Sequence, residues 1–231
     1  MLSCLVHSFP RSETIAQHPL QTDGGARITE FLPPDHEHDE FRVRQTVLKK
    51  KLDKFKATQG DSAKSPPLCH WHLHKDEYFY VEKGSILLKI DGEDHIITAK
   101  DRVIEIKAGV YHSFDIDPNS NEDLVWVAYV EPEDGLTEKF FRNAFGYLDD
   151  CQNKRITPNL FQLLVFLYHD GTFVALPRLP KFLGKWLSRW VFGYFGGRVI
   201  GEKLLGFKDN YPEYFLSQDS GTGKNSDKKT E

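Results

Sequence analysis

Seven short apolar runs, each ended by turn-forming residues, follow one another through the middle of the chain. They are residues 67–74, 77–82, 84–90, 95–99, 103–107, 111–116 and 124–131. The breaks between them carry Gly, Asp, Asn and Lys, and Asp91-Gly92 is a typical hairpin turn. No helical pattern separates the runs, which argues against a parallel sheet. The pattern therefore predicts an antiparallel β-sandwich or β-barrel.

The first run contains two histidines that are two residues apart. Alternate side chains of a strand point to the same side, so His70 and His72 are expected to project together. Glu77 can return to the same place if the chain turns at residues 75–76. Closing a barrel would also bring His112 over the His70/His72 strand. Three imidazoles and one carboxylate suit a divalent transition metal such as iron, manganese, nickel or zinc.

His74 is a rival ligand, because it shares the strand face of His70 and His72. It stands at the predicted turn, however, where the direction of a side chain is least defined, so the His70/His72 pair is preferred. Five aromatic residues are candidates for the wall of the site or for the core: Tyr78, Tyr80, Tyr111, Phe114 and Trp126.

Two motifs resemble those of the cupin family. The first joins two histidines, a glutamate and a glycine as His70-x-His72-(x4)-Glu77-(x6)-Gly84, and the second has the core Gly109-(x2)-His112. The resemblance implies an antiparallel, jelly-roll-like cupin β-barrel. It also implies one divalent transition metal, with Fe(II) as the first choice and Mn, Ni or Zn as alternatives. The implied ligands are His70, His72, Glu77 and His112.

Four positions depart from the family pattern, and none of them is a ligand position. Lys64 stands where the first motif usually opens with glycine. In the second motif the family usually has glycine, proline and asparagine, where this chain has Asp101, Lys107 and Ile116. These are turn and packing positions, so the departures bear on loop geometry more than on metal binding.

Small single-barrel cupins with a helical extension include oxidoreductases of fungal polyketide pathways, and this chain resembles them. The resemblance implies a metal-dependent, dioxygenase-like oxidoreductase that acts on a hydrophobic, polyketide-like small molecule in secondary metabolite biosynthesis. Two alternatives stay open: a non-redox metal cupin, such as an isomerase or decarboxylase, and a metal-free binding or scaffold cupin. No catalytic acid or base and no site for an organic cofactor is identified.

The chain is expected to divide into four parts. They are an N-terminal arm at residues 1–39, the cupin barrel at 40–132, a C-terminal α-helical extension at 133–216 and a disordered tail at 217–231. At the start of the barrel, residues 41–52 alternate and predict an edge strand. The polar residues 54–65 predict a loop.

The stretch Lys181–Phe207 mixes aromatic and basic residues, and three interpretations of it stay open. It packs on the barrel or forms a homodimer contact, it forms a lid for an apolar substrate, or it lies on a membrane surface as a peripheral contact. Its five glycines favour close helix packing or breaks in the helix.

The bulk composition excludes some classes of partner. The net charge of −4 gives no electrostatic case for nucleic acid as a partner. The three cysteines are widely spaced and form no disulfide framework. No apolar run approaches the ~18–20 residues of a spanning helix. We therefore expect an intracellular, cytoplasmic protein.

Overall fold

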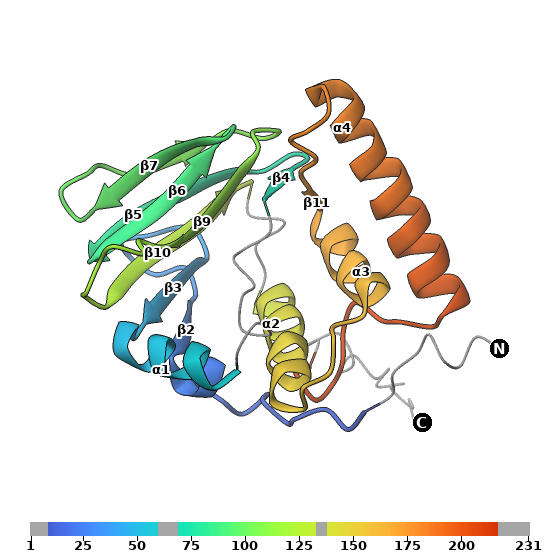
Figure 1. Cartoon of the computed structure of the whole chain (residues 1–231), viewed down its shortest axis with the longest axis horizontal. Helices are drawn as coiled ribbons and strands as arrows, with labels where there is room; N and C mark the ends of the chain where they lie inside the picture. Colours follow the sequence, from blue (N-terminus) through green and yellow to red (C-terminus); the bar gives the residue numbers. More distant parts are fainter. Residues whose placement is uncertain (1–8, 60–68, 133–137, 217–231) are drawn as a thin grey trace, which may run out of the picture.

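The computed structural model describes residues 9–59, 69–132 and 138–216 (Figure 1). The strands are β1 (Leu20–Thr22), β2 (Arg27–Leu32), β3 (Arg42–Val47), β4 (His70–His72), β5 (Asp76–Lys83), β6 (Ser85–Ile90), β7 (Glu93–Thr98), β8 (Ile104–Ile106), β9 (His112–Ile116), β10 (Leu124–Glu131) and β11 (Thr172–Val174). The helices are η2 (Asp23–Gly25), α1 (Lys49–Gln59), α2 (Glu138–Asn153), α3 (Leu160–Asp170), α4 (Lys181–Leu187) and η4 (Ser188–Leu204).

The strands form two antiparallel sheets. One has the order β1-β2-β3-β10-β5-β8, and the other has the order β11-β4-β9-β6-β7. On β5 the side chains of Glu77, Phe79 and Val81 are buried while their neighbours are less so, as alternation along a strand requires. Apolar residues from the inner faces of both sheets form one core, among them Phe79, Ile86, Leu88, Ile116 and Trp126. The seven predicted apolar runs are confirmed as β4 to β10.

The region before β4 differs from the sequence-based expectation. β3 is not an edge strand, because β2 pairs with one side of it and β10 with the other. The strands β1 and β2 come from the predicted N-terminal arm. The end of the predicted strand (49–52) and the described part of the predicted loop (54–59) both belong to the helix α1, in which Leu52 is buried in the core between the sheets. The secondary structure of this region depends on contacts with residues remote in the sequence, and a local sequence pattern does not show such contacts.

The helices α2, α3, α4 and η4 lie beside the two sheets (Figure 1), and they follow residue 133, where the sequence predicts a helical extension. Residues 211–214 hold α2 and α3 together. Tyr214 is fully buried and donates a hydrogen bond to Asp150 of α2 at 2.6 Å. Tyr211 donates to Gln162 of α3 at 2.5 Å. Both contacts satisfy polar groups that burial would otherwise leave unpaired.

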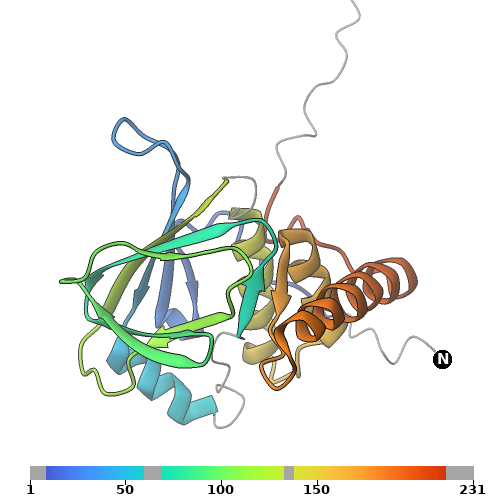
Figure 2. The ribbon, with the colours of Figure 1, turned by 90° about the horizontal axis from the view of Figure 1, so that it is seen from above.

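The helix α4 continues directly into η4, a π-helix, and the two form the long helix seen at the edge of the molecule in both views (Figure 1 and Figure 2). It packs against α3 and β11. No helix in the described part of the chain is long and apolar enough to cross a membrane. Several predicted features lie outside the described residues: Cys4, the part of the predicted loop at 60–65 with Lys64, residues 67–68 of the first predicted run, and the tail at 217–231.

Candidate metal centre

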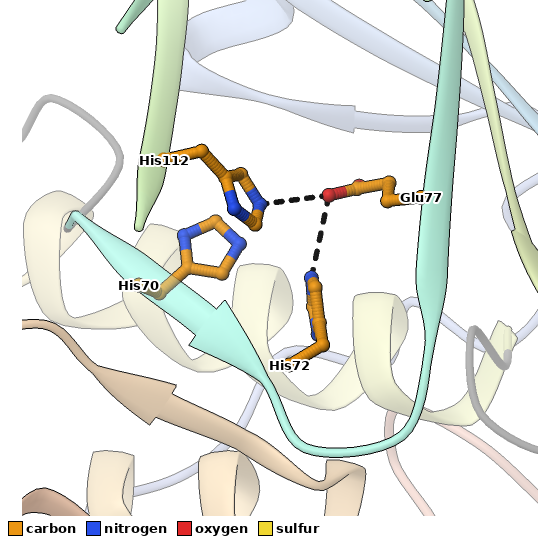
Figure 3. A group of neighbouring side chains, drawn as sticks. All are labelled: His70, His72, Glu77 and His112. Atoms are coloured by element: carbon orange, nitrogen blue, oxygen red, sulfur yellow. Dashed lines mark hydrogen bonds and ion pairs between the residues drawn. The ribbon is translucent and has the colours of Figure 1, made fainter. Parts of the chain in front are cut away.

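Three strands bring the four predicted ligands together. His70 and His72 project from the same face of β4, and His112 on β9 is the cross-strand partner of His70. β5 belongs to the other sheet, so Glu77 approaches the histidines from the opposite side (Figure 3). One ligand atom from each residue lies within 4.8 Å of the others. The structure thus places side chains that are up to 42 residues apart in the sequence around one point.

The backbone explains why both motifs contain a glycine, Gly84 in the first and Gly109 in the second. Gly84 has φ +79°, and a Cβ there would lie 2.5 Å from the carbonyl oxygen of Asp123. Gly109 has φ +81°, and its N–H donates to the carbonyl of His72 at 2.8 Å. Both φ values lie in the left-handed region that favours glycine. Gly109 therefore ties the loop before His112 to the strand that carries His70 and His72.

The site is closed except on one side. His72, Glu77 and His112 are at most 4% exposed, whereas His70 is half-buried. The ring of Phe114 lies 6.4 Å from that of His70 and packs edge-on against Phe79 and Trp126. His70 is therefore the most exposed of the four side chains, and an apolar wall borders it.

Hydrogen bonds determine which ring nitrogens face the centre of the cluster. His112 Nδ1 lies 3.0 Å from the carbonyl oxygen of Val110, which only accepts, so Nδ1 carries a proton. His72 Nδ1 lies 2.9 Å from Thr172 Oγ1, whose own hydroxyl proton goes to the Asp170 carboxylate. Each Nδ1–H is thus engaged, which leaves Nε2 of both rings for the centre.

The Nε2 atoms of His72 and His112 and the Glu77 carboxylate are all acceptors when these two rings are neutral. Nε2 of His112 and of His72 lie 2.9 Å and 3.3 Å from the same Glu77 oxygen, Oε2. Lone pairs of two imidazoles and a carboxylate repel one another unless a positive charge lies among them. Either a ring proton or a metal ion supplies that charge.

The pKa values of these groups follow from the same crowding. Burial acts to raise the pKa of the Glu77 carboxyl, but hydrogen bonds from His112 and His72 outweigh it and hold that pKa well below its usual range. Burial acts to lower the pKa of His112, but the bond to Glu77 outweighs it and raises that pKa. A carboxylate is therefore kept ionised among imidazoles, and this donor set fits a divalent transition metal.

Comparison with known proteins agrees with the motifs. The sequence model of the cupin domain family matches residues 55–130 of this chain. The probable oxidoreductase virH of Hypocrea virens is 38% identical over 214 residues, which cover 89% of this chain and 90% of that protein. The chain belongs to the cupin family. The oxidoreductase iacF of Pestalotiopsis fici is 39% identical over 201 residues, 85% of this cupin and 93% of the relative.

A third relative has a more specific name. The epoxidase atD of Aspergillus terreus is 29% identical over 231 residues, covering 93% of this cupin and 68% of the epoxidase. These matches extend beyond the residues of the cupin domain into the C-terminal extension, because they cover most of the chain. The two sheets are accordingly the jelly-roll-like cupin barrel, followed by an α-helical extension.

The extension supplies residues to the site that the sequence analysis missed. β11 pairs with β4, with Thr172 opposite His72. Asp170 accepts from Thr172 and is paired with the buried Lys75. Burial raises the pKa of the Asp170 carboxyl, although Lys75 and Thr172 act to lower it. Asp170 and Thr172 lie about 100 residues after His72, and a helix end followed by a short strand carries no motif that marks them.

The remaining candidates divide into residues near the site and residues remote from it. His74 is exposed and lies outside the cluster. Phe114 and Trp126 are near the site, as described above. Tyr78 stacks on Tyr129 on the outer side of its sheet and bonds to Glu105 and Glu131. Tyr111 packs with Trp71 and Phe173 behind β4. Alternation along β4 and β5 explains this division.

Proposed function

We propose that this cupin is a metal-dependent oxidoreductase that acts on a hydrophobic small molecule, and that His70, His72, Glu77 and His112 hold its metal. The observation that carries the proposal is the convergence of two imidazole Nε2 atoms and a carboxylate oxygen with no donor of their own among them. A metal ion satisfies all of these acceptors at once, whereas a ring proton satisfies them only in part.

The relatives support redox chemistry and, with it, the choice of metal. virH and iacF are named oxidoreductases and atD an epoxidase. Zinc has no redox chemistry, so Fe(II) is our first choice and manganese the next. When bound, such an ion supplies electrons to the reaction and polarises oxygen atoms of bound molecules.

The protein's own residues orient the ligands and shape the approach. Thr172 and Val110 hold the rings of His72 and His112 in one tautomer. Glu77 supplies the negative charge of the site. The half-buried His70 and the ring of Phe114 border the approach, which suits an apolar substrate. A polyketide-like substrate and a place in secondary metabolite biosynthesis rest on the family resemblance.

Metal content per chain tests the proposal. The protein is purified without oxygen and without a metal-affinity tag, as wild type, His70→Ala, His112→Ala and His74→Ala. We expect close to one iron per chain in the wild type and in His74→Ala, and loss of the metal in the other two variants. His74 is a matched control, because it belongs to the same segment but is exposed outside the cluster.

Activity then separates the alternatives. The iron-loaded wild type is expected to consume oxygen with lipophilic phenols or polyketides, and His112→Ala is not. A metal-bearing protein without oxygen-dependent turnover would support a non-redox isomerase or decarboxylase. A wild type that takes up neither Fe(II), Mn(II), Ni(II) nor Zn(II) would overturn the enzyme proposal in favour of a binding barrel.

A further inference from the structure

The long helix α4–η4 turns its smallest residues toward the protein. Its buried positions are all glycine or serine: Gly184, Ser188, Gly193, Gly196, Gly197 and Gly201. A Cβ at Gly193 would lie 2.6 Å from the ring of Phe173, and a Cβ at Gly197 would lie 2.6 Å from the carbonyl of Leu164. Such contacts require glycine, so the orientation of the helix on α3 and β11 is firmly set.

The large apolar residues of the same helix consequently face outward. We call five of them the aromatic face: Phe182, Trp186, Trp190, Tyr194 and Phe195. Their exposed fractions are 78%, 55%, 46%, 46% and 54%. Surface apolar residues are common singly, but five exposed aromatic residues on one helix, with the rings of Trp190 and Tyr194 in contact, indicate an interaction surface. The close packing of the glycines prevents the helix from turning this face inward.

Basic residues surround the aromatic face. The stretch 178–204 has six basic residues and one acidic residue, a net charge of +5 in a chain whose net charge is −4. The one acidic residue, Glu202, is already paired with Arg198, Lys203 and His169. Positive charge in this protein is therefore concentrated beside its most exposed aromatic residues.

Three of these cations, Arg178, Lys185 and Arg189, have no carboxylate partner among the described residues. Lys185 lies over the ring of Trp71, and Arg189 lies over that of Trp190. A groove of about 420 Å³ opens beside them, and Trp71, Trp186 and Trp190 also line it. A groove with aromatic walls and two cations can accept the phosphate headgroup of a lipid.

We propose that α4–η4 docks this protein on the surface of an anionic lipid bilayer, with the aromatic face at the headgroup level. Trp and Phe beside Lys and Arg are typical of helices that lie in the membrane interface. Basic residues near an anionic surface add electrostatic attraction to it. A second copy of the chain is a poorer occupant, because Lys185 and Arg189, which have no carboxylate partner among the described residues, would repel their counterparts on an identical face.

Vesicle co-sedimentation with the full-length protein tests the docking. Vesicles contain either phosphatidylcholine alone or equal parts of phosphatidylcholine and phosphatidylserine. We expect binding to the anionic vesicles that weakens as salt is added, and much weaker binding to the neutral ones. Trp186→Ser/Trp190→Ser and Arg189→Glu are each expected to weaken binding roughly tenfold, since each removes or reverses groups worth about 1 kcal/mol or more.

A matched control comes from the opposite end of the molecule. Ile96 and Val103 are 50% and 49% exposed on the barrel, and Ile96→Ser/Val103→Ser should leave vesicle binding unchanged. Thermal melting of all variants establishes that they are folded, independently of the proposed function. Absence of binding to anionic vesicles, or equal loss in the control, would overturn the proposal. So would a homodimer that Trp186→Ser/Trp190→Ser dissociates, because the face would then be a subunit interface.

Discussion

The side chains of β4, residues 70–72, are held by different interactions on the two faces of the strand. On the inner face, His70 and His72 join a cluster of polar groups whose distances are set by hydrogen bonds. On the outer face, Trp71 is 4% exposed and stacks on Phe173, with ring centres 5.1 Å apart. Polarity organises one side of the strand and apolar packing organises the other.

A single strand of the extension supports both faces. In β11, Thr172 accepts from His72 and the next residue, Phe173, packs on Trp71. The extension is therefore part of the metal site's framework as well as of the core. Removing a contact on the outer face of β4 should therefore lower the stability of the fold, whereas removing one on the inner face should lower metal affinity. The following predictions test that division.

Truncating the outer face should have the largest effect. Trp71→Ala removes a buried aromatic side chain, so we expect the free energy of unfolding to fall by about 3–5 kcal/mol. Urea unfolding measures this change, and Trp190→Ala is the control because Trp190 is 46% exposed. The molecules of Trp71→Ala that remain folded should still bind one metal each. Loss of the metal from folded protein would show that the two faces are not independent.

Removing the inner hydroxyl should act chiefly on the metal. Thr172→Val leaves the Nδ1–H of His72 and an oxygen of Asp170 without their partner. We expect metal affinity to fall about 10–100-fold, as is typical for groups that orient a metal ligand. Competition with a chelator measures the affinity. Thr172→Ser restores the hydroxyl and should restore binding, whereas equal affinities in all three proteins would contradict the role of Thr172.

The pH dependence of metal binding should show that the metal replaces a proton. Glu77 raises the pKa of His112, so without metal this pair's stabilisation is complete below the ordinary histidine pKa of about 6.5 and is lost as pH rises through the raised value. The lowered pKa of Glu77 keeps its charge until much lower pH. We expect metal affinity to rise about tenfold per pH unit for each proton displaced. A flat profile measured by isothermal titration would exclude such displacement.

A surface ion pair between the extension and the barrel should matter least. Lys181 Nζ lies 2.7 Å from Asp91 Oδ2, and both side chains are partly or largely exposed. We expect Lys181→Gln to change the free energy of unfolding by no more than about 1 kcal/mol. A larger change in thermal or urea unfolding would mean that the extension is held by charge rather than by packing.

The sequence by itself determined the barrel strands and the set of candidate ligands. Period-two alternation and turn residues are local signals, and they located β4 to β10. The spacing of His70, His72 and Glu77 is also local, since one strand and one turn bring them together. His112 could be added because an antiparallel sheet places distant strands side by side, and the family motif marks its position.

Only the tertiary structure decided which segments complete the sheets and support the site. β2 converts the predicted edge strand β3 into an inner one, and β11 brings Thr172 and Asp170 to His72. The orientation of α4–η4 was equally undetermined, because its glycines and its aromatic residues could each have faced the protein. Close packing against α3 and β11 selected the glycines. Such choices depend on contacts between residues far apart in the sequence, which no local pattern encodes.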